Sequence, residues 1–137
     1  MTFRAFIPLL LFALLSACAA RQVSLPPGSN NPAVLALLGS ADAKAGAGQI
    51  SAAAADLERA LRIEPRNPVL WHELAHLHLQ EGDYRQAESL AARSNSWAGV
   101  NRALLALNWR IIAEARSNLG DDSGAQAALA RARELGE

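Results

Sequence analysis

A unit of about 34 residues recurs three times after residue 33, and this period constrains the fold more than any other feature of the chain. The most complete copy runs from Trp71 to Ala91 and has a Gly82-Asp83 pair near its centre. Small and apolar residues return at fixed offsets, about 34 residues before this copy and about 38 residues after it. Such a period is the signature of stacked helix–turn–helix units. The recurring positions are Leu37, Ala41, Gly48, Ile50, Ala53, Leu57, Ala60 and Pro65 in the first copy, Trp71, Leu74, Ala75, His78, Gly82, Asp83, Tyr84, Ala87 and Ala91 in the second, and Trp109, Ile112, Ala113, Gly120, Asp121, Ala125, Leu129 and Ala132 in the third.

Each unit is predicted to form two amphipathic helices that pack against each other. In the second copy, Trp71, Leu74, Ala75 and His78 recur at helical spacing and form one face of the first helix. The Gly82-Asp83 pair then ends this helix. Small side chains on the shared face let the two helix backbones approach closely. The sequence therefore predicts an array of helix pairs.

The boundaries between units follow from their breaker residues. Pro65 and Asn67-Pro68 end the first unit and start the second. The longer offset before the third unit inserts about four residues, which is about one helical turn. We therefore expect the first helix of the third unit to start early, near Gly99 or Asn101.

Two further positions carry expectations. Trp97 shares its repeat register with Ile63 and Leu135, so we expect it in the core. Ser40 and Lys44 stand where apolar residues are expected, which makes the first unit degenerate. Terminal repeats are often atypical, since one side of them has no neighbouring repeat.

The array resembles the tetratricopeptide repeat family across residues 34–137. The resemblance implies an all-α fold, an α-solenoid of three helix–turn–helix repeats at residues 33–67, 68–101 and 102–137, the third with an extended first helix. It also implies a protein or peptide partner, because members of this family hold partner segments in a concave groove lined by the first helices.

The N-terminal segment has the pattern of a bacterial export signal. It carries one positive charge at Arg4, then an apolar run over residues 6–15, and small residues before Cys18. This run is too short for a spanning helix, which needs about 20 apolar residues. A signal peptide is therefore predicted at residues 1–17. Residues 18–32 are rich in proline, glycine, serine and asparagine and are predicted to form a flexible tether.

The end of this segment, Leu15-Ser16-Ala17-Cys18, resembles the lipobox of bacterial lipoproteins. The resemblance implies that Cys18 becomes a lipidated N-terminus, and several acyl chains would hold the protein stably on a bilayer. Ala19 follows Cys18, which by the same resemblance favours the outer membrane, with the array facing the periplasm. The alternative is an ordinary secretory peptide in which Cys18 is incidental.

Composition excludes several classes of function. Thirteen basic and 13 acidic residues give a formal net charge of zero, so the basic face expected of a nucleic-acid-binding protein is not indicated. The single cysteine rules out an internal disulfide and any multi-cysteine metal site. We expect no cofactor.

The repeat register also selects a candidate partner-binding groove. Because Leu74 and Ala75 face the inside of their unit, His72 and His76 are predicted on the exposed side of the same helix. The alternative is that such positions are ordinary solvated helix-face residues. The predicted groove residues are Leu38, Asp42, Val69, His72, His76, Leu79, Leu107, Arg110 and Glu114.

The segment from His72 to His76 also matches H-E-x-x-H, the motif of zinc-dependent proteases. On a helix the two histidines lie one turn apart, and Glu73 would act as general base. A catalytic zinc needs a third protein ligand. His78 lies only two residues beyond His76 and points elsewhere, and Glu88 on the next helix is the nearby alternative. The register therefore favours peptide contact over a metal site.

These observations predict a non-enzymatic, outer-membrane-anchored lipoprotein that faces the periplasm and binds or scaffolds envelope proteins. Pilus or secretin assembly and regulation of peptidoglycan enzymes are examples of such roles. Two alternatives stay open: a zinc-dependent hydrolase that uses His72 and His76, and a self-associating structural lipoprotein. The second follows because no capping helix is predicted after Leu135, which leaves the oligomeric state open.

Overall fold

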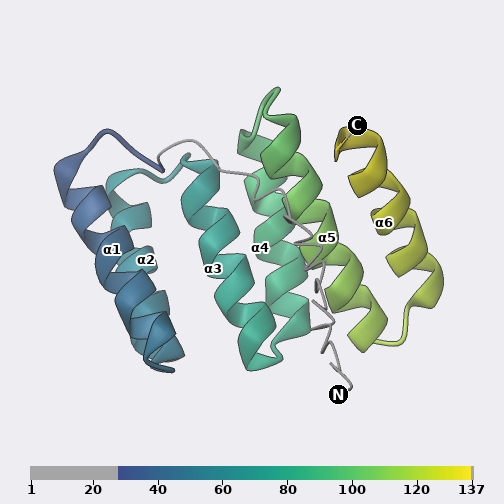
Figure 1. Ribbon diagram of the computed structural model, residues 1–137, viewed down its shortest axis with the longest axis horizontal. Coiled ribbons are helices and arrows are strands. Elements are labelled where there is room, and N and C mark those ends of the chain that lie inside the picture. Colours follow the sequence, from purple (N-terminus) through teal and green to yellow (C-terminus); the bar gives the residue numbers. More distant parts are fainter. Residues whose placement is uncertain (1–27, 137) are drawn as a thin grey trace, which may run out of the picture.

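The computed structural model describes residues 28–136, and all regular secondary structure in this range is helical. The predicted signal peptide, Cys18 and the tether up to residue 27 lie outside the described residues. The helices form three antiparallel pairs placed side by side in sequence order (Figure 1), so the fold is the predicted all-α solenoid. None of them is long and apolar enough to cross a membrane. The helices are α1 (Pro32–Gly46), α2 (Ile50–Ile63), α3 (Pro68–Glu81), α4 (Tyr84–Trp97), α5 (Arg102–Asn118) and α6 (Asp122–Gly136).

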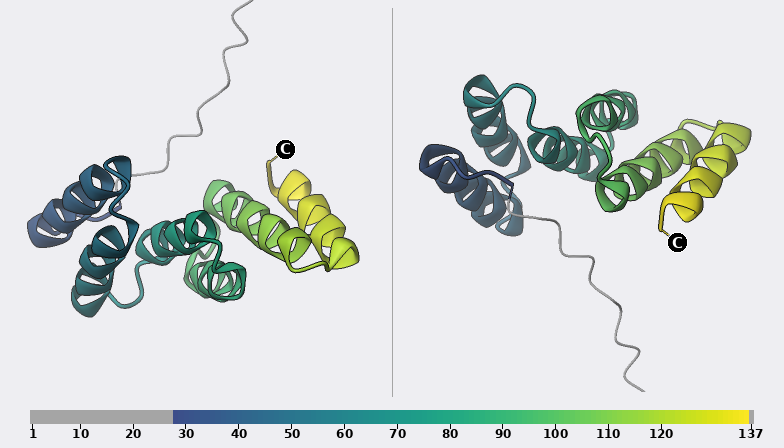
Figure 2. Two further views of the ribbon diagram at one scale, coloured as in Figure 1. Left: turned by 90° about the horizontal axis from the view of Figure 1, so that it is seen from below. Right: turned by 90° about the horizontal axis from the view of Figure 1, so that it is seen from above.

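Successive helices alternate between two layers (Figure 2). The first helices of the pairs, α1, α3 and α5, form one layer, and α2 and α4 form the other. α6 packs beside α5 at the C-terminal end of the array, and α3 also contacts α5 directly. This arrangement gives the three first helices a common face.

An asparagine caps the start of each first helix. Asn31 accepts a hydrogen bond from the amide of Ala33, Asn67 from that of Val69, and Asn101 from that of Leu104. Asparagine is among the best N-cap residues because its side-chain oxygen satisfies an amide that has no partner inside the helix. These caps fix the start of every repeat.

The early start of the third repeat follows from the last of these caps. α5 begins at Arg102 and contains 17 residues, whereas α3 contains 14. Leu104 lies on the additional turn and is fully buried. The inserted turn therefore adds apolar contact to the core as well as length.

Glycine marks the turn inside each pair. Gly48, Gly82 and Gly120 have φ angles of 75°, 81° and 82°. This left-handed conformation is common just after a helix and is nearly free of strain only for glycine. Its return in every unit explains why glycine belongs to the repeat pattern.

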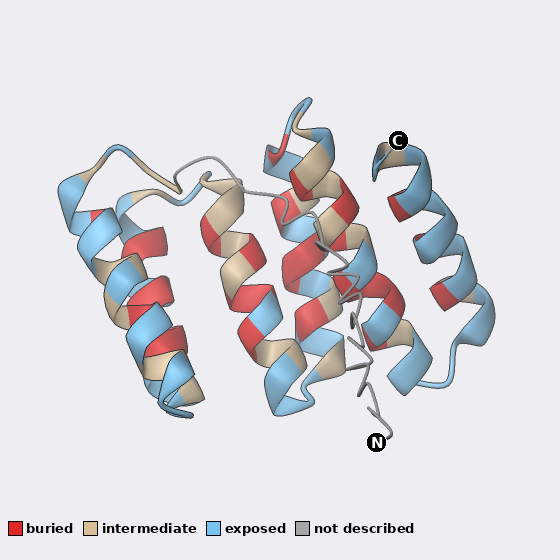
Figure 3. Ribbon diagram, in the orientation of Figure 1, coloured by how far each residue is buried: buried red, intermediate tan, exposed pale blue. Residues whose placement is uncertain are grey.

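The core runs continuously between the two layers (Figure 3) and is built from a few leucines and many alanines. Leu57 and Leu70 are buried beside alanines such as Ala53, Ala75 and Ala87, each of which is fully buried. Because an alanine side chain is one methyl group, the helix backbones lie close together wherever two helices cross at these positions. Larger residues there would push the helices apart.

The polar residues of the first repeat have a structural partner. Lys44 and Ser40 of α1 both donate to the carboxylate of Asp56 on α2, and the Ser40 Oγ to Asp56 Oδ2 distance is 2.6 Å. Hydrogen bonds from Lys44 and Ser40 hold the pKa of the Asp56 carboxyl below its ordinary value of 3.8. A buried polar cluster thus replaces an apolar contact between α1 and α2.

Trp97 is not in the core. Its side chain is 42 % exposed, and Ile63, its register equivalent in the first repeat, is exposed as well. Both residues lie at the C-terminal end of the second helix of their pair. The guanidinium of Arg66 lies over the Trp97 ring, 5.3 Å from its centroid. The expectation of a core position is wrong, because residues at equivalent repeat positions need not be covered by neighbouring side chains to the same extent.

Candidate protein-binding site

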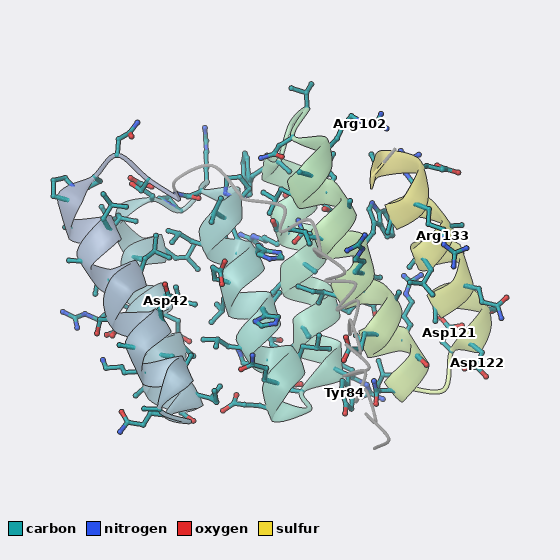
Figure 4. The ribbon with its side chains drawn as sticks, viewed as in Figure 1. Asp42, Tyr84, Arg102, Asp121, Asp122 and Arg133 are labelled. Carbon is teal, nitrogen blue, oxygen red and sulfur yellow. The ribbon has the colours of Figure 1, made fainter. Side chains whose placement is uncertain are left out.

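Four of the predicted groove residues are exposed: Asp42 of α1, His76 of α3, and Arg110 and Glu114 of α5. We call the surface that these four residues define the first-helix face. Asp42 lies midway along α1 on this surface (Figure 4). Four further predicted residues are partly buried: Leu38, Val69, Leu79 and Leu107.

His72 is the exception, since its side chain is only 8 % exposed. Its Nδ1 lies 2.7 Å from Oδ1 of Asn108 on α5. The Asn108 amide nitrogen donates to Ser94 Oγ and Asn95 Oδ1 on α4, and the Ser94 hydroxyl donates to the backbone oxygen of Pro68. Since Asn108 uses its nitrogen as the donor to α4, its oxygen accepts, and His72 Nδ1 carries the hydrogen.

This network joins three helices, α3, α4 and α5, across the junction of the second and third repeats. Asn108 is fully buried, and each of its polar atoms has a partner. The expectation that His72 lies on the exposed side of its helix is therefore wrong. The reason is that α5 approaches α3 directly and brings Asn108 against the imidazole.

Sequence reasoning did not identify Asn108 or Ser94. A signal was present for Asn108, because it interrupts an apolar stripe that includes Leu104, Ile111 and Ile112. A polar residue inside an apolar stripe calls for a buried hydrogen-bond partner. The identity of that partner, His72, depends on which helices meet and is not encoded locally.

A cavity of about 250 Å³ opens between α1 and α3. It has apolar walls from residues such as Ala41 and Leu77, and its polar groups come from Asp42, Glu73, His76 and Gln80. The cavity thus joins two predicted groove residues from different repeats. Its mixed lining suits a side chain that has both an apolar stem and a polar end.

A second hollow lies between α5 and α6 and measures about 570 Å³. Arg110 and Glu114 line it on the α5 side, and Gln126 and Leu129 line it on the α6 side. Arg110 also borders a neighbouring cavity of about 310 Å³ that includes Leu107 and Leu135. Arg110 therefore borders both hollows.

The start of the described chain covers part of this surface. A Cβ added to Gly28 would lie 2.9 Å from the side chain of Leu38 and 3.3 Å from that of Val69. The Asn67 amide donates to the Gly28 oxygen, and Ser29 Oγ donates to Glu64 Oε1 at 2.6 Å. Leu38 and Val69 thus meet the incoming chain, so the open part of the first-helix face begins beyond them.

The potential zinc ligands have other contacts. His72 is engaged with Asn108, whereas His76 is exposed and lies 3.5 Å from Gln80 Nε2. Glu88 accepts a hydrogen bond from Arg116 Nε at 2.7 Å. Within residues 28–136, no group of three histidine, cysteine or acidic side chains is arranged to hold a metal ion.

Comparison with known proteins agrees with this architecture. The sequence pattern of the tetratricopeptide repeat matches residues 44–108. Among solved structures, the globular C-terminal domain of P. aeruginosa LpoP is 43 % identical, with a TM-score of 0.74. The alignment covers 77 % of this chain and 99 % of that domain. No curated protein matches the chain. The identity and the coverage together show that the chain belongs to the tetratricopeptide repeat family.

Proposed function

We propose that this protein is a non-catalytic adaptor, anchored to the outer membrane through Cys18, that binds a segment of an envelope protein on its first-helix face. The observation that carries the proposal is the pair of cavities beside His76 and Arg110, two exposed residues on the first helices of neighbouring repeats. Apolar walls with polar groups at the rim suit a peptide that is held by a few side chains.

The similarity to the LpoP domain supports a protein-binding role, because the fold and nearly the whole length of that domain are shared. The rigid first helices set the distance between the residues that would contact the peptide. His76 and Arg110 stand on helices fixed to each other by the His72–Asn108 network, so their spacing is preset. A preset surface costs less conformational entropy on binding than a surface that must first become ordered.

The double substitution His76→Glu with Arg110→Glu is expected to abolish capture of the partner. It places carboxylates at both cavities and removes the one basic side chain of the first-helix face. Loss of such central contacts typically weakens binding about ten-fold or more. The measurement is chemical cross-linking in membranes, followed by purification of this protein and identification of what it retains.

The matched control is Arg85→Glu with Ser89→Glu, which changes the same net charge on exposed positions of α4 in the other layer. This control should retain the partner at the wild-type level. If the first double variant also retains it, the first-helix face is not the binding surface. The identity of the captured protein then separates pilus or secretin assembly from regulation of peptidoglycan enzymes.

Anchoring is tested separately at Cys18. Cys18→Ala is expected to move the protein from the membrane fraction to the soluble fraction, because the sole acyl acceptor of the proposed anchor is lost. Palmitate labelling of the protein should disappear in the same variant, whereas Ser16→Ala should keep both the label and the membrane association. A Cys18→Ala protein that still sediments fully with membranes would refute lipid anchoring.

A further inference from the structure

Charged side chains are distributed unevenly between the two ends of the array. One end contains the loops that follow α2 and α4 and the C-terminus of α6, and we call it the tether end, defined by residues 28–31, 62–67, 93–102 and 131–136. Arg102 and Arg133 lie towards this end, whereas Asp121 and Asp122 lie at the opposite end (Figure 4). The charged residues of the tether end are Arg62, Arg66, Arg93, Arg102, Arg131, Arg133, Glu64 and Glu134.

Both acidic groups of the tether end are engaged. Glu64 accepts hydrogen bonds from Ser29 and Asn67, and Glu134 pairs with Arg131 at 2.7 Å. Arg62 and Arg133 are exposed. At the opposite end, the turns and the helix residues beside them carry Glu81, Asp83, Asp121 and Asp122, whereas Lys44 and Arg116 there are paired with Asp56 and Glu88, and Arg85 is exposed. The tether end is therefore the more positive of the two ends, although the chain has no net charge.

Apolar side chains are exposed on the same end. Val100, in the loop between α4 and α5, is 96 % exposed, and Trp97 and Ile63 end their helices with their side chains partly open. The stacking of Arg66 on Trp97 keeps a cation beside the indole. A tryptophan beside an arginine, together with a more exposed aliphatic side chain, is a combination that binds at bilayer surfaces. The tryptophan ring then lies at the level of the headgroups.

The chain enters the array at this end. Gly28 is held there by Asn67 and packs on Val69. Nine residues lie between Cys18 and Gly28, and the ten residue steps from one to the other span at most about 35 Å when the segment is fully extended. An anchor at Cys18 therefore places the point of attachment of the array at the tether end, within about 35 Å of the membrane, and the opposite end lies about 20 Å further along the helices.

From the positive charge, the exposed Trp97 and Val100 and the entry of the chain at Gly28, we infer that the tether end docks on the anionic phospholipid headgroups of the membrane. Docking orients the helix axes roughly along the bilayer normal. The first-helix face is then directed parallel to the membrane plane, towards partners. Each arginine near an anionic surface strengthens such binding about five-fold, and added salt weakens it.

The test uses a chemical tether in place of the biological one. Residues 18–137, which include every described residue, are coupled through Cys18, the single cysteine, to a maleimide phospholipid in vesicles of phosphatidylethanolamine and phosphatidylglycerol. Some of the lipids carry bromine on their acyl chains, which quenches tryptophan at the bilayer. The chain has three tryptophans, so the Trp97→Phe variant separates the Trp97 signal from the rest. Trp71 lies at the same end, because its indole donates to the Pro65 oxygen and lies under Arg93, so all proteins in this test carry Trp71→Phe. We expect bromine to quench the emission of the Trp71→Phe protein and to have little effect on the emission of the protein that also carries Trp97→Phe.

Charge reversal supplies the matched pair of variants. Arg62→Glu with Arg133→Glu should lose most of the quenching, whereas Arg85→Glu with Gln86→Glu and Ser89→Glu, which makes the same change in charge on exposed residues of α4 away from the tether end, should keep it. Emission that is insensitive to bromine would overturn the inference. So would equal quenching in phosphatidylcholine vesicles or in the Arg62/Arg133 variant, because proximity through the tether would then explain the signal.

This inference rests on the proposed anchoring only for the location of the membrane. Because the maleimide link replaces the natural lipid, the quenching result does not depend on whether Cys18 is acylated in cells. Palmitate labelling tests the anchor, and the quenching tests the docking surface. Failure of one is therefore distinguishable from failure of the other.

Discussion

Asn108→Ala is expected to lower the free energy of unfolding by about 3 kcal/mol, because it leaves several buried polar groups without partners. His72 Nδ1 loses its acceptor, and Ser94 and Asn95 lose their donor. Asn108 is fully buried, so water cannot easily replace these bonds without opening the junction between the second and third repeats. Urea unfolding followed by the helical circular dichroism signal measures the loss.

Asn118→Ala is the control on the same helix, since Asn118 is exposed and bonds only to a backbone oxygen one turn away. Its effect should stay within about 0.5 kcal/mol. In a double-mutant cycle, His72→Ala and Asn108→Ala should be non-additive by about 1 kcal/mol or more, because they break the same bond. Additive effects would mean that the His72–Asn108 bond contributes nothing by itself.

Local signals in the sequence were sufficient to predict the fold class. Asn67 and Pro68 start α3 with an N-cap and a proline in the first turn, and Gly82 ends it in the left-handed conformation. Each of these signals acts within a few residues, so it does not depend on the rest of the fold. The spacing of apolar and small residues then specifies which helix faces are buried.

The candidate site depended on contacts between repeats, which local signals do not contain. The register put His72, His76 and Arg110 on the same side of their helices; His76 and Arg110 are exposed, whereas α5 covers His72. Trp97 was misplaced for the opposite reason, because at the end of α4 it is covered only in part, with Arg66 over its ring, and stays 42 % exposed. Burial depends on the neighbouring helix, and a repeat register describes only equivalent positions.

The first repeat illustrates how an apparent departure can have a structural cause. Ser40 and Lys44 weaken the apolar pattern of α1, and taken alone they indicate a degenerate unit. Asp56, one helix later, binds both of them, so the three residues form one polar contact between α1 and α2. Buried ionic groups are tolerated when they are paired and hydrogen-bonded, and such a triplet is visible only after the helices have been paired.

Leu57→Ala is expected to destabilise the protein by about 3 kcal/mol, whereas Leu129→Ala is expected to cost less than about 1 kcal/mol. The two leucines occupy equivalent repeat positions, on α2 and α6. Leu57 is 1 % exposed because α3 covers it, and Leu129 is 40 % exposed because no described helix follows α6. Truncating Leu57 therefore leaves a cavity, and truncating Leu129 removes contacts from a side chain that is already open.

The difference in stability between Leu57→Ala and Leu129→Ala also tests self-association, because a second copy packed on α6 would bury Leu129. In that case Leu129→Ala would destabilise the protein more at high protein concentration, and light scattering would give a smaller mass for the variant than for the wild type. If α6 faces solvent, the urea concentration at the midpoint of unfolding does not depend on the protein concentration for either variant. A loss for Leu129→Ala as large as that for Leu57→Ala would contradict an open α6 and favour an oligomer, in which the last repeat is covered by another subunit.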